Sequence, residues 1–155
     1  MLYLVRHGHA GNKHAWQGTD ELRPLSPRGR LQAEGLVRLL APYAVRRILS
    51  SPTERCRQTV TPLARVRGLR VTDEPRLGVG VDLDRVLAWL GDRGLEGAVA
   101  CTHGEVIGAV VERLAAQGVR FGPERRWLKG SVWVLDGLGG QVARARYLAP
   151  VPVPD

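Results

Sequence analysis

The stretch Leu2-Tyr3-Leu4-Val5-Arg6-His7-Gly8 stands near the start of the chain. Its four apolar residues do not alternate with polar ones, which predicts a short strand buried on both faces, as in a parallel sheet. A similar run, Ala98-Val99-Ala100-Cys101, leads through Thr102 to His103. The two runs predict parallel strands that each end beside a histidine.

Between and after these runs the chain alternates between strand and helix patterns. We expect further strands at 45–50, 69–72, 131–135 and 141–148, and helices at 27–41, from Glu54 to Gly68, at 83–92 and after His103. Ser26-Pro27 is typical of a helix start. The apolar stripe of that first helix is predicted from its leucines, Leu31, Leu36, Leu39 and Leu40.

This alternation predicts an α/β fold, a three-layer α/β/α sandwich with a mostly parallel central sheet. The 155 residues fit one domain, which we place at 1–149, followed by a short C-terminal tail at 150–155. The start of the chain lacks the features of a signal peptide, and no apolar run is long enough to span a membrane. We therefore expect a cytoplasmic protein without a membrane partner.

The chain carries a formal net charge of +8, supplied almost entirely by arginine. A basic protein favours anionic partners such as phosphorylated small molecules, phosphoproteins or nucleic acid. No nucleic-acid-binding motif or basic stripe interleaved with aromatic residues is present, so nucleic acid is not the expected partner. Scattered, solvated arginines explain much of the excess as well.

Cationic and titratable side chains are predicted to meet at one edge of the sheet. Ligands of open α/β sheets bind beyond the carboxyl ends of the strands. Arg6 and His7 follow the first strand, Arg55 lies in the helix after the second, and His103 follows the fourth. Arginine pairs with phosphate oxygens through two nitrogens, and a neutral imidazole is a competent nucleophile. The combination predicts phosphoryl transfer.

Metal binding is a competing use of the same histidines. The spacing of His7 and His9, with a distant His103, is compatible with a zinc site. No cluster of cysteines or carboxylates accompanies them, and Arg6 and Arg55 would repel a cation. We therefore predict no metal.

Four motifs in series resemble the histidine phosphatase superfamily, also called phosphoglycerate-mutase-like. They lie at 4–8 (Leu-Val-Arg-His-Gly), 24–33, 50–59 (Ser-Ser-Pro-Thr-Glu-Arg-Cys-Arg-Gln-Thr) and 101–104 (Cys-Thr-His-Gly). The short chain is similar to the small bacterial phosphohistidine phosphatases. Stretches at 11–25 and 129–135 also resemble the C-terminal domain of some two-domain Nudix hydrolases. The Nudix half has no counterpart in this sequence, so no Nudix activity is expected.

The resemblance implies a role for each matched residue. His7 would accept the phosphoryl group, and Arg6, Arg55 and His103 would bind it and stabilise its transition state. The residues expected to contact the rest of the substrate are Gly8, Asn12, Lys13 and Gly104. No metal or organic cofactor is implied.

One departure concerns the acid that protonates the leaving oxygen in many members of the superfamily. Val79 stands where the resemblance leads us to expect that acid. Glu74, Asp82 and Glu105 are the alternatives, and Glu74 and Glu105 are the ones we retain as possible general acids. A leaving group that needs little protonation, such as that of a phosphoramidate or a diphosphate, tolerates the loss.

These observations predict a metal-independent phosphatase that acts through a phosphohistidine intermediate on His7. Its substrate would be a phosphohistidine protein or a small phosphate ester or anhydride such as a nucleotide. The alternative is a catalytically weak module that binds phosphate or a phosphoprotein and has kept the pocket. Hydrolysis measurements separate the two.

Overall fold

A computed structural model describes residues 1–137, 139 and 141–154. Seven strands form one sheet in the order β3-β2-β4-β1-β6-β7-β5. The strands are β1 (Leu2–Arg6), β2 (Arg47–Ser50), β3 (Val71–Asp73), β4 (Ala98–Thr102), β5 (Arg120–Phe121), β6 (Val132–Asp136) and β7 (Arg144–Leu148). The helices are α1 (Pro27–Leu39), α2 (Glu54–Arg67), α3 (Leu83–Leu90) and α4 (Gly104–Ala116), with 3-10 turns η1 (Asp20–Leu22), η2 (Pro75–Leu77) and η3 (Arg93–Leu95).

Parallel pairing dominates the sheet, as predicted. Strands β3, β2, β4 and β1 run parallel, β6 is antiparallel to both β1 and β7, and β5 is parallel to β7. The expected element order is confirmed, with shifts of one to three residues at several ends. Strand β5 was not predicted, because two residues are too few to show a pattern.

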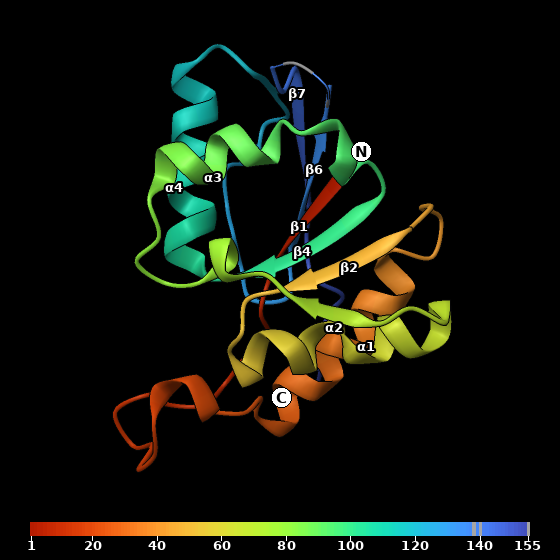
Figure 1. Cartoon of the computed structure of the whole chain (residues 1–155). Helices are drawn as coiled ribbons and strands as arrows, with labels where there is room; N and C mark the ends of the chain where they lie inside the picture. The colour runs from red at the N-terminus through yellow and green to blue at the C-terminus, as the bar shows by residue number, and fades with distance from the viewer. Residues whose placement is uncertain (138, 140, 155) are drawn as a thin grey trace.

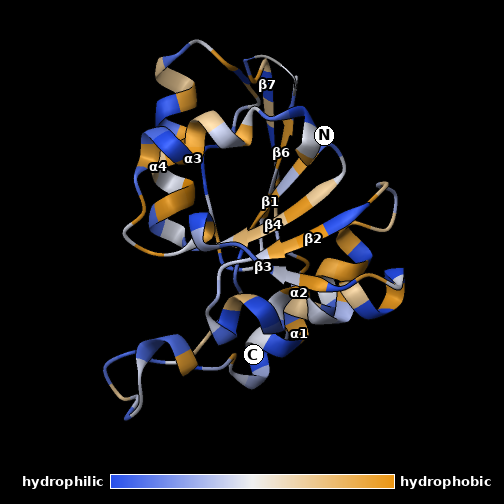
Figure 2. Cartoon of the chain, in the orientation of Figure 1, coloured by the Kyte–Doolittle hydropathy of each residue, from blue (hydrophilic) through white to orange (hydrophobic). Residues whose placement is uncertain are grey.

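Helices cover both faces of the sheet, α1 and α2 on one and α3 and α4 on the other (Figure 1). Strand β1 is apolar on both faces because each face packs into a different hydrophobic cluster. Tyr3 and Val5 pack into the cluster beneath α1 and α2, whereas Leu2 and Leu4 pack into the cluster beneath α3 and α4. The apolar colouring of Figure 2 accordingly follows the strands and the inward faces of the helices. The predicted three-layer sandwich is confirmed.

Helix α1 begins as predicted and turns its predicted face inward except at Leu31. The Ser26 hydroxyl accepts a hydrogen bond from the Gly29 amide, with Pro27 at the first helical position. The prediction for Leu31 is wrong, since it is 41% exposed. The predicted Leu36 and Leu40 are buried and Leu39 packs against the same cluster. The buried face also includes Gly29, Gln32 and Ala33. A Cβ atom on Gly29 would lie 2.0 Å from the His9 carbonyl oxygen, so the close approach of α1 to the loop after β1 selects the face with small residues.

The end of α2 follows the sequence closely. Gly68 adopts φ 66°, a left-handed conformation that glycine takes without steric cost, and it ends the helix as expected. The glycine-rich turn between β6 and β7 is described only in part, because Leu138 and Gly140 lie outside the described residues. Within the described part of the chain, no helix is both long and apolar enough to cross a membrane.

Candidate active site

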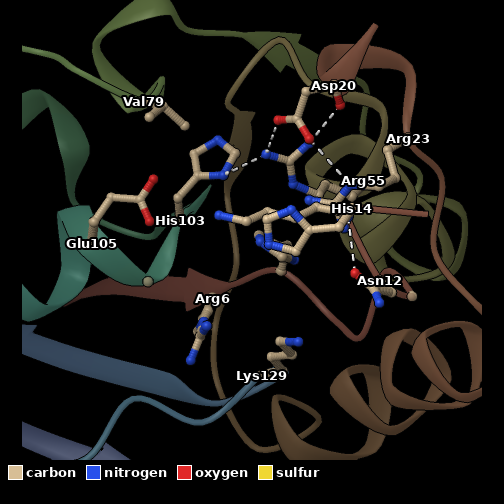
Figure 3. A pocket seen from close by; sticks show the side chains of 14 residues that line it. Arg6, Asn12, His14, Asp20, Arg23, Arg55, Val79, His103, Glu105 and Lys129 are labelled. Atoms are coloured by element: carbon tan, nitrogen blue, oxygen red, sulfur yellow. Dashed lines mark hydrogen bonds and ion pairs between the residues drawn. The ribbon is translucent and has the colours of Figure 1, made fainter. Parts of the chain in front are cut away.

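A pocket of about 490 Å³ opens at the carboxyl ends of β1 and β4, where α4 begins and α2 passes close by (Figure 3). Its lining comes mostly from β1, α2, α4 and the long loop before α1. The lining residues are Arg6, His7, Gly11, Asn12, Lys13, His14, Asp20, Arg23, Arg55, Val79, His103, Gly104, Glu105 and Lys129. The four residues predicted to carry the chemistry all lie in this one pocket.

His7 is held by the backbone on both sides. Its amide donates to the Thr102 carbonyl (3.1 Å), which ties the end of β1 to β4. Its ring Nδ1 lies 2.7 Å from the Gly8 carbonyl oxygen and therefore carries the proton. Nε2 is left with the lone pair and has no hydrogen-bond partner within the described residues.

The electrostatic surroundings keep this imidazole neutral. Burial lowers the pKa of His7 to about 3, against the opposing hydrogen bond to Gly8. The nearby His103, Arg55 and Arg6 lower that pKa further. A neutral ring with a free Nε2 can act as a nucleophile at physiological pH.

His103 faces His7 across the pocket, with ring centroids 5.4 Å apart and planes at 67°. Its Nε2 lies 2.8 Å from the Ser51 hydroxyl and 3.7 Å from the Cys56 thiol. Its Nδ1 lies 3.5 Å from Nη2 of Arg55. Contacts on both ring nitrogens fix the orientation of this second imidazole.

Arg55 is buried and is held by the loop before α1. Its Nη1 donates to the Asp20 carbonyl (2.8 Å), and its Nη2 donates to the Asp20 carboxylate (3.0 Å). Burial raises the pKa of Asp20, but hydrogen bonds and charge from Arg23 and Arg55 outweigh it and leave that pKa below its usual value. Asp20 is therefore an anion that positions Arg55 at the edge of the pocket.

Arg6 lies against the start of α4. Its Nη1 donates to the Trp127 carbonyl (2.7 Å). Gly104 makes room for it, because a Cβ atom there would lie 2.8 Å from Cζ and Nε of Arg6. Among the described residues, the buried Nε atoms of both Arg6 and Arg55 lack a hydrogen-bond partner. Two buried donors without acceptors beside a nucleophile are suited to a bound anion.

The predicted substrate-contacting residues divide into two groups. Asn12, Lys13 and Gly104 line the pocket. Gly8 does not, and its backbone is used inside the protein: its amide donates to the Thr59 hydroxyl (2.9 Å) and its carbonyl accepts from His7. Gly8 orients the His7 ring instead of facing the pocket.

The carboxylates considered as general acids lie in different places. Glu105 lines the pocket beside Val79, as Figure 3 shows. Glu74 is paired with Arg76 at 2.7 Å and is not among the pocket residues. Its pKa is lowered, chiefly by that hydrogen bond, which opposes a role as proton donor. Asp82 caps α3 through the Asp84 amide.

The charged pocket residues that were not singled out from the sequence as site residues are Asp20, Arg23 and Lys129. The length and polarity of the loop at 9–25 pointed to a functional segment but not to these positions. The histidine pair considered for zinc is divided, since Nδ1 of His9 lies 2.7 Å from the Ser26 hydroxyl and His9 does not line the pocket. Within the described residues, no group of three or more His, Cys, Asp or Glu side chains is placed to hold a metal ion.

Comparison with known proteins connects this pocket to a family. The model of the histidine phosphatase superfamily (branch 1) matches residues 2–78. An 8-oxo-(d)GTP phosphatase of Mycolicibacterium smegmatis is 36% identical over 157 residues, which cover 96% of this chain and 48% of that protein. The chain thus spans about half the length of this curated relative.

Solved structures share the fold. The protein histidine phosphatase SixA complexed with tungstate has a TM-score of 0.71 at 21% identity, covering 96% of this chain and 94% of that one. A mycobacterial glucosyl-3-phosphoglycerate phosphatase has a TM-score of 0.59 at 21% identity, covering 94% and 95%. The predicted phosphoglycerate-mutase-like fold is confirmed.

The family model covers the half of the chain that carries His7 and Arg55, and the likeness to the curated relative extends over the half that carries His103. The chain belongs to the histidine phosphatase superfamily (branch 1).

Proposed function

We propose that this chain is a metal-independent phosphatase that works through a phosphohistidine on His7. The observation that carries the proposal is the state of that ring, which is buried, neutral, and fixed through Nδ1 so that Nε2 is left for attack. Two guanidinium groups with unpaired buried donors lie beside it. Substrates would be a phosphohistidine protein or a small phosphate ester or anhydride such as a nucleotide, met in the cytoplasm.

The reaction proceeds in two displacements. The Nε2 lone pair of His7 attacks phosphorus, and the bond from phosphorus to the leaving group breaks. Arg6, Arg55 and His103 hold the three remaining oxygens, where charge is stabilised in the transition state. Water then attacks the phosphohistidine, the N–P bond breaks, and phosphate is released with Nε2 restored.

The expected effect of His7→Ala is loss of turnover. The variant keeps the rest of the pocket but removes the nucleophile, so hydrolysis of an aryl phosphate should fall by at least about a thousandfold. Arg65→Ala is the matched control, since Arg65 is exposed on α2 and does not line the pocket. Circular dichroism and thermal unfolding check that both variants fold.

Two outcomes would contradict the proposal. Turnover of His7→Ala equal to the unchanged protein would exclude His7 as the nucleophile. Tight binding of phosphate or vanadate by the unchanged protein, without hydrolysis of aryl, acyl or anhydride phosphates, would instead establish the phosphate-binding module.

A further inference from the structure

The pocket has room and positive charge beyond what one phosphoryl group needs. A phosphoryl group is the size of a few water molecules, each of which takes about 30 Å³ in the liquid. One such group therefore leaves most of the 490 Å³ pocket free. Arg6, His7, Arg55 and His103 surround the site of transfer. Three further cations, Lys13, Arg23 and Lys129, line the same pocket outside that group, and Arg23 is paired with Asp20.

Among the described residues, no carboxylate is paired with either lysine. The pocket lining contains two carboxylates, and Asp20 is taken up by Arg23 and Arg55. Within the described part of the chain, neither lysine lies within ion-pair distance of a carboxylate. Burial lowers the pKa of Lys129, and the charges of Arg6, Arg23 and Arg28 lower it further. A second anionic group of a ligand would offset this crowding of positive charge.

The lack of an obvious proton donor in the pocket gives an independent indication of the kind of leaving group. Val79 stands at the wall where a proton donor would be expected. The remaining carboxylate of the lining, Glu105, lies near Arg6: burial lowers the pKa of that guanidinium, and the charge of Glu105 opposes the shift. An alkoxide leaves poorly without a proton. A phosphate leaves readily, because its second pKa is about 6.

We propose that the substrates of this site are phosphoanhydrides, in which a second phosphate is the leaving group and Lys13 and Lys129 hold it. This inference rests on the proposed function and selects among its substrates. The N–P bond forms at Nε2 of His7 while the bond from phosphorus to the bridging oxygen breaks. The bridging oxygen departs with the electron pair as part of the leaving phosphate, and no proton donor is required.

The test compares three substrates that differ in the leaving group. GDP loses its terminal phosphoryl group from a phosphate, GMP from an alkoxide, and phosphoramidate from a neutral amine. The expected order of kcat/KM in the unchanged protein places GDP first. Hydrolysis of GMP or phosphoramidate at a higher kcat/KM than GDP would overturn the inference.

Charge removal locates the binding of the leaving phosphate. In Lys13→Ala and Lys129→Ala, kcat/KM for GDP should fall about tenfold each, and about a hundredfold in the double variant, because each removes a charge-assisted hydrogen bond. The value for phosphoramidate should fall much less. Arg65→Ala removes the same charge from a distant surface and should change neither. Equal losses on GDP and phosphoramidate would overturn the inference.

A gain of function tests the missing acid. Val79 is 54% exposed, so the wall tolerates a larger polar side chain. Val79→Glu should raise the ratio of kcat/KM for GMP to kcat/KM for GDP about tenfold or more. An equal rise for GDP would show that its leaving group also needs a proton, which contradicts the inference. If the unchanged protein hydrolyses none of the three, the proposed function fails; if it hydrolyses them without these differences, only this inference fails.

Discussion

The burial of His7 has a consequence for stability as well as for catalysis. Its pKa is about 3 in the folded protein, against 6.5 for an unperturbed imidazole. Between these values the unfolded chain binds a proton that the folded chain does not. The contribution of the neutral, buried His7 to the free energy of unfolding is therefore complete above pH 6.5 and is lost as the pH falls toward 3.

We predict that His7→Gln removes this dependence. A single group contributes at most about 1.4 kcal/mol of unfolding free energy per pH unit. Urea unfolding between pH 4 and 6.5 should show the unchanged protein losing stability faster than the variant as the pH falls. Parallel pH curves for the two proteins would mean that His7 is not buried in its neutral form.

The sequence predicted the inner residues of the pocket because they follow strand ends. Arg6, His7 and His103 sit at the carboxyl ends of buried strands, where any α/β sheet places its ligands. Asp20 gave no such signal. It reaches Arg55 only because the loop before α1 folds back over α2. An irregular loop has no periodic sequence pattern from which its path could be predicted.

The start of helix α4 determines where the Arg6 guanidinium lies. Gly104 is the first residue of the helix and packs directly against that group. The atoms that a new side chain would displace are at the end of a flexible arginine, so the backbone does not have to move. Catalysis should therefore be more sensitive to this position than folding.

We predict that Gly104→Ala lowers kcat/KM by about tenfold to a hundredfold, less than the full loss of a transition-state donor. The unfolding free energy should change by less than about 1 kcal/mol, since alanine suits a helix. Gly122→Ala is the control, because a Cβ atom there meets open space. Unchanged kinetics in Gly104→Ala would show that the position of Arg6 does not matter.

Elements with a clear local sequence pattern were predictable, and features that depend on tertiary contacts were not. The apolar run of β1 and the Ser26-Pro27 start of α1 were predictable from local chemistry. The exposure of Leu31 on α1 was not, because the exact inward face depends on how closely Gly29 approaches the loop after β1. Strand β5 exists only through its pairing with β7, which joins Arg120 and Phe121 to Arg144 and Ala145.

For the molecule as a whole, the sheet order brings distant parts of the chain to one pocket. Strand β4 lies between β1 and β2, so residues near positions 7, 55 and 103 converge although nearly a hundred positions separate them. The family could be predicted from the series of four motifs. The extent of the domain at 1–149 and the cytoplasmic location stay predictions.

In the proposed mechanism the phosphoryl group passes through His7. The most direct test mixes the protein with an aryl phosphate, quenches within milliseconds in alkali, where N-phosphohistidine survives, and locates the added phosphate by mass spectrometry. We predict a phosphoryl group on His7 and on no other residue, with its formation lost in His7→Ala. Turnover of the substrate without a phosphorylated His7, or with the label on His103, would contradict it.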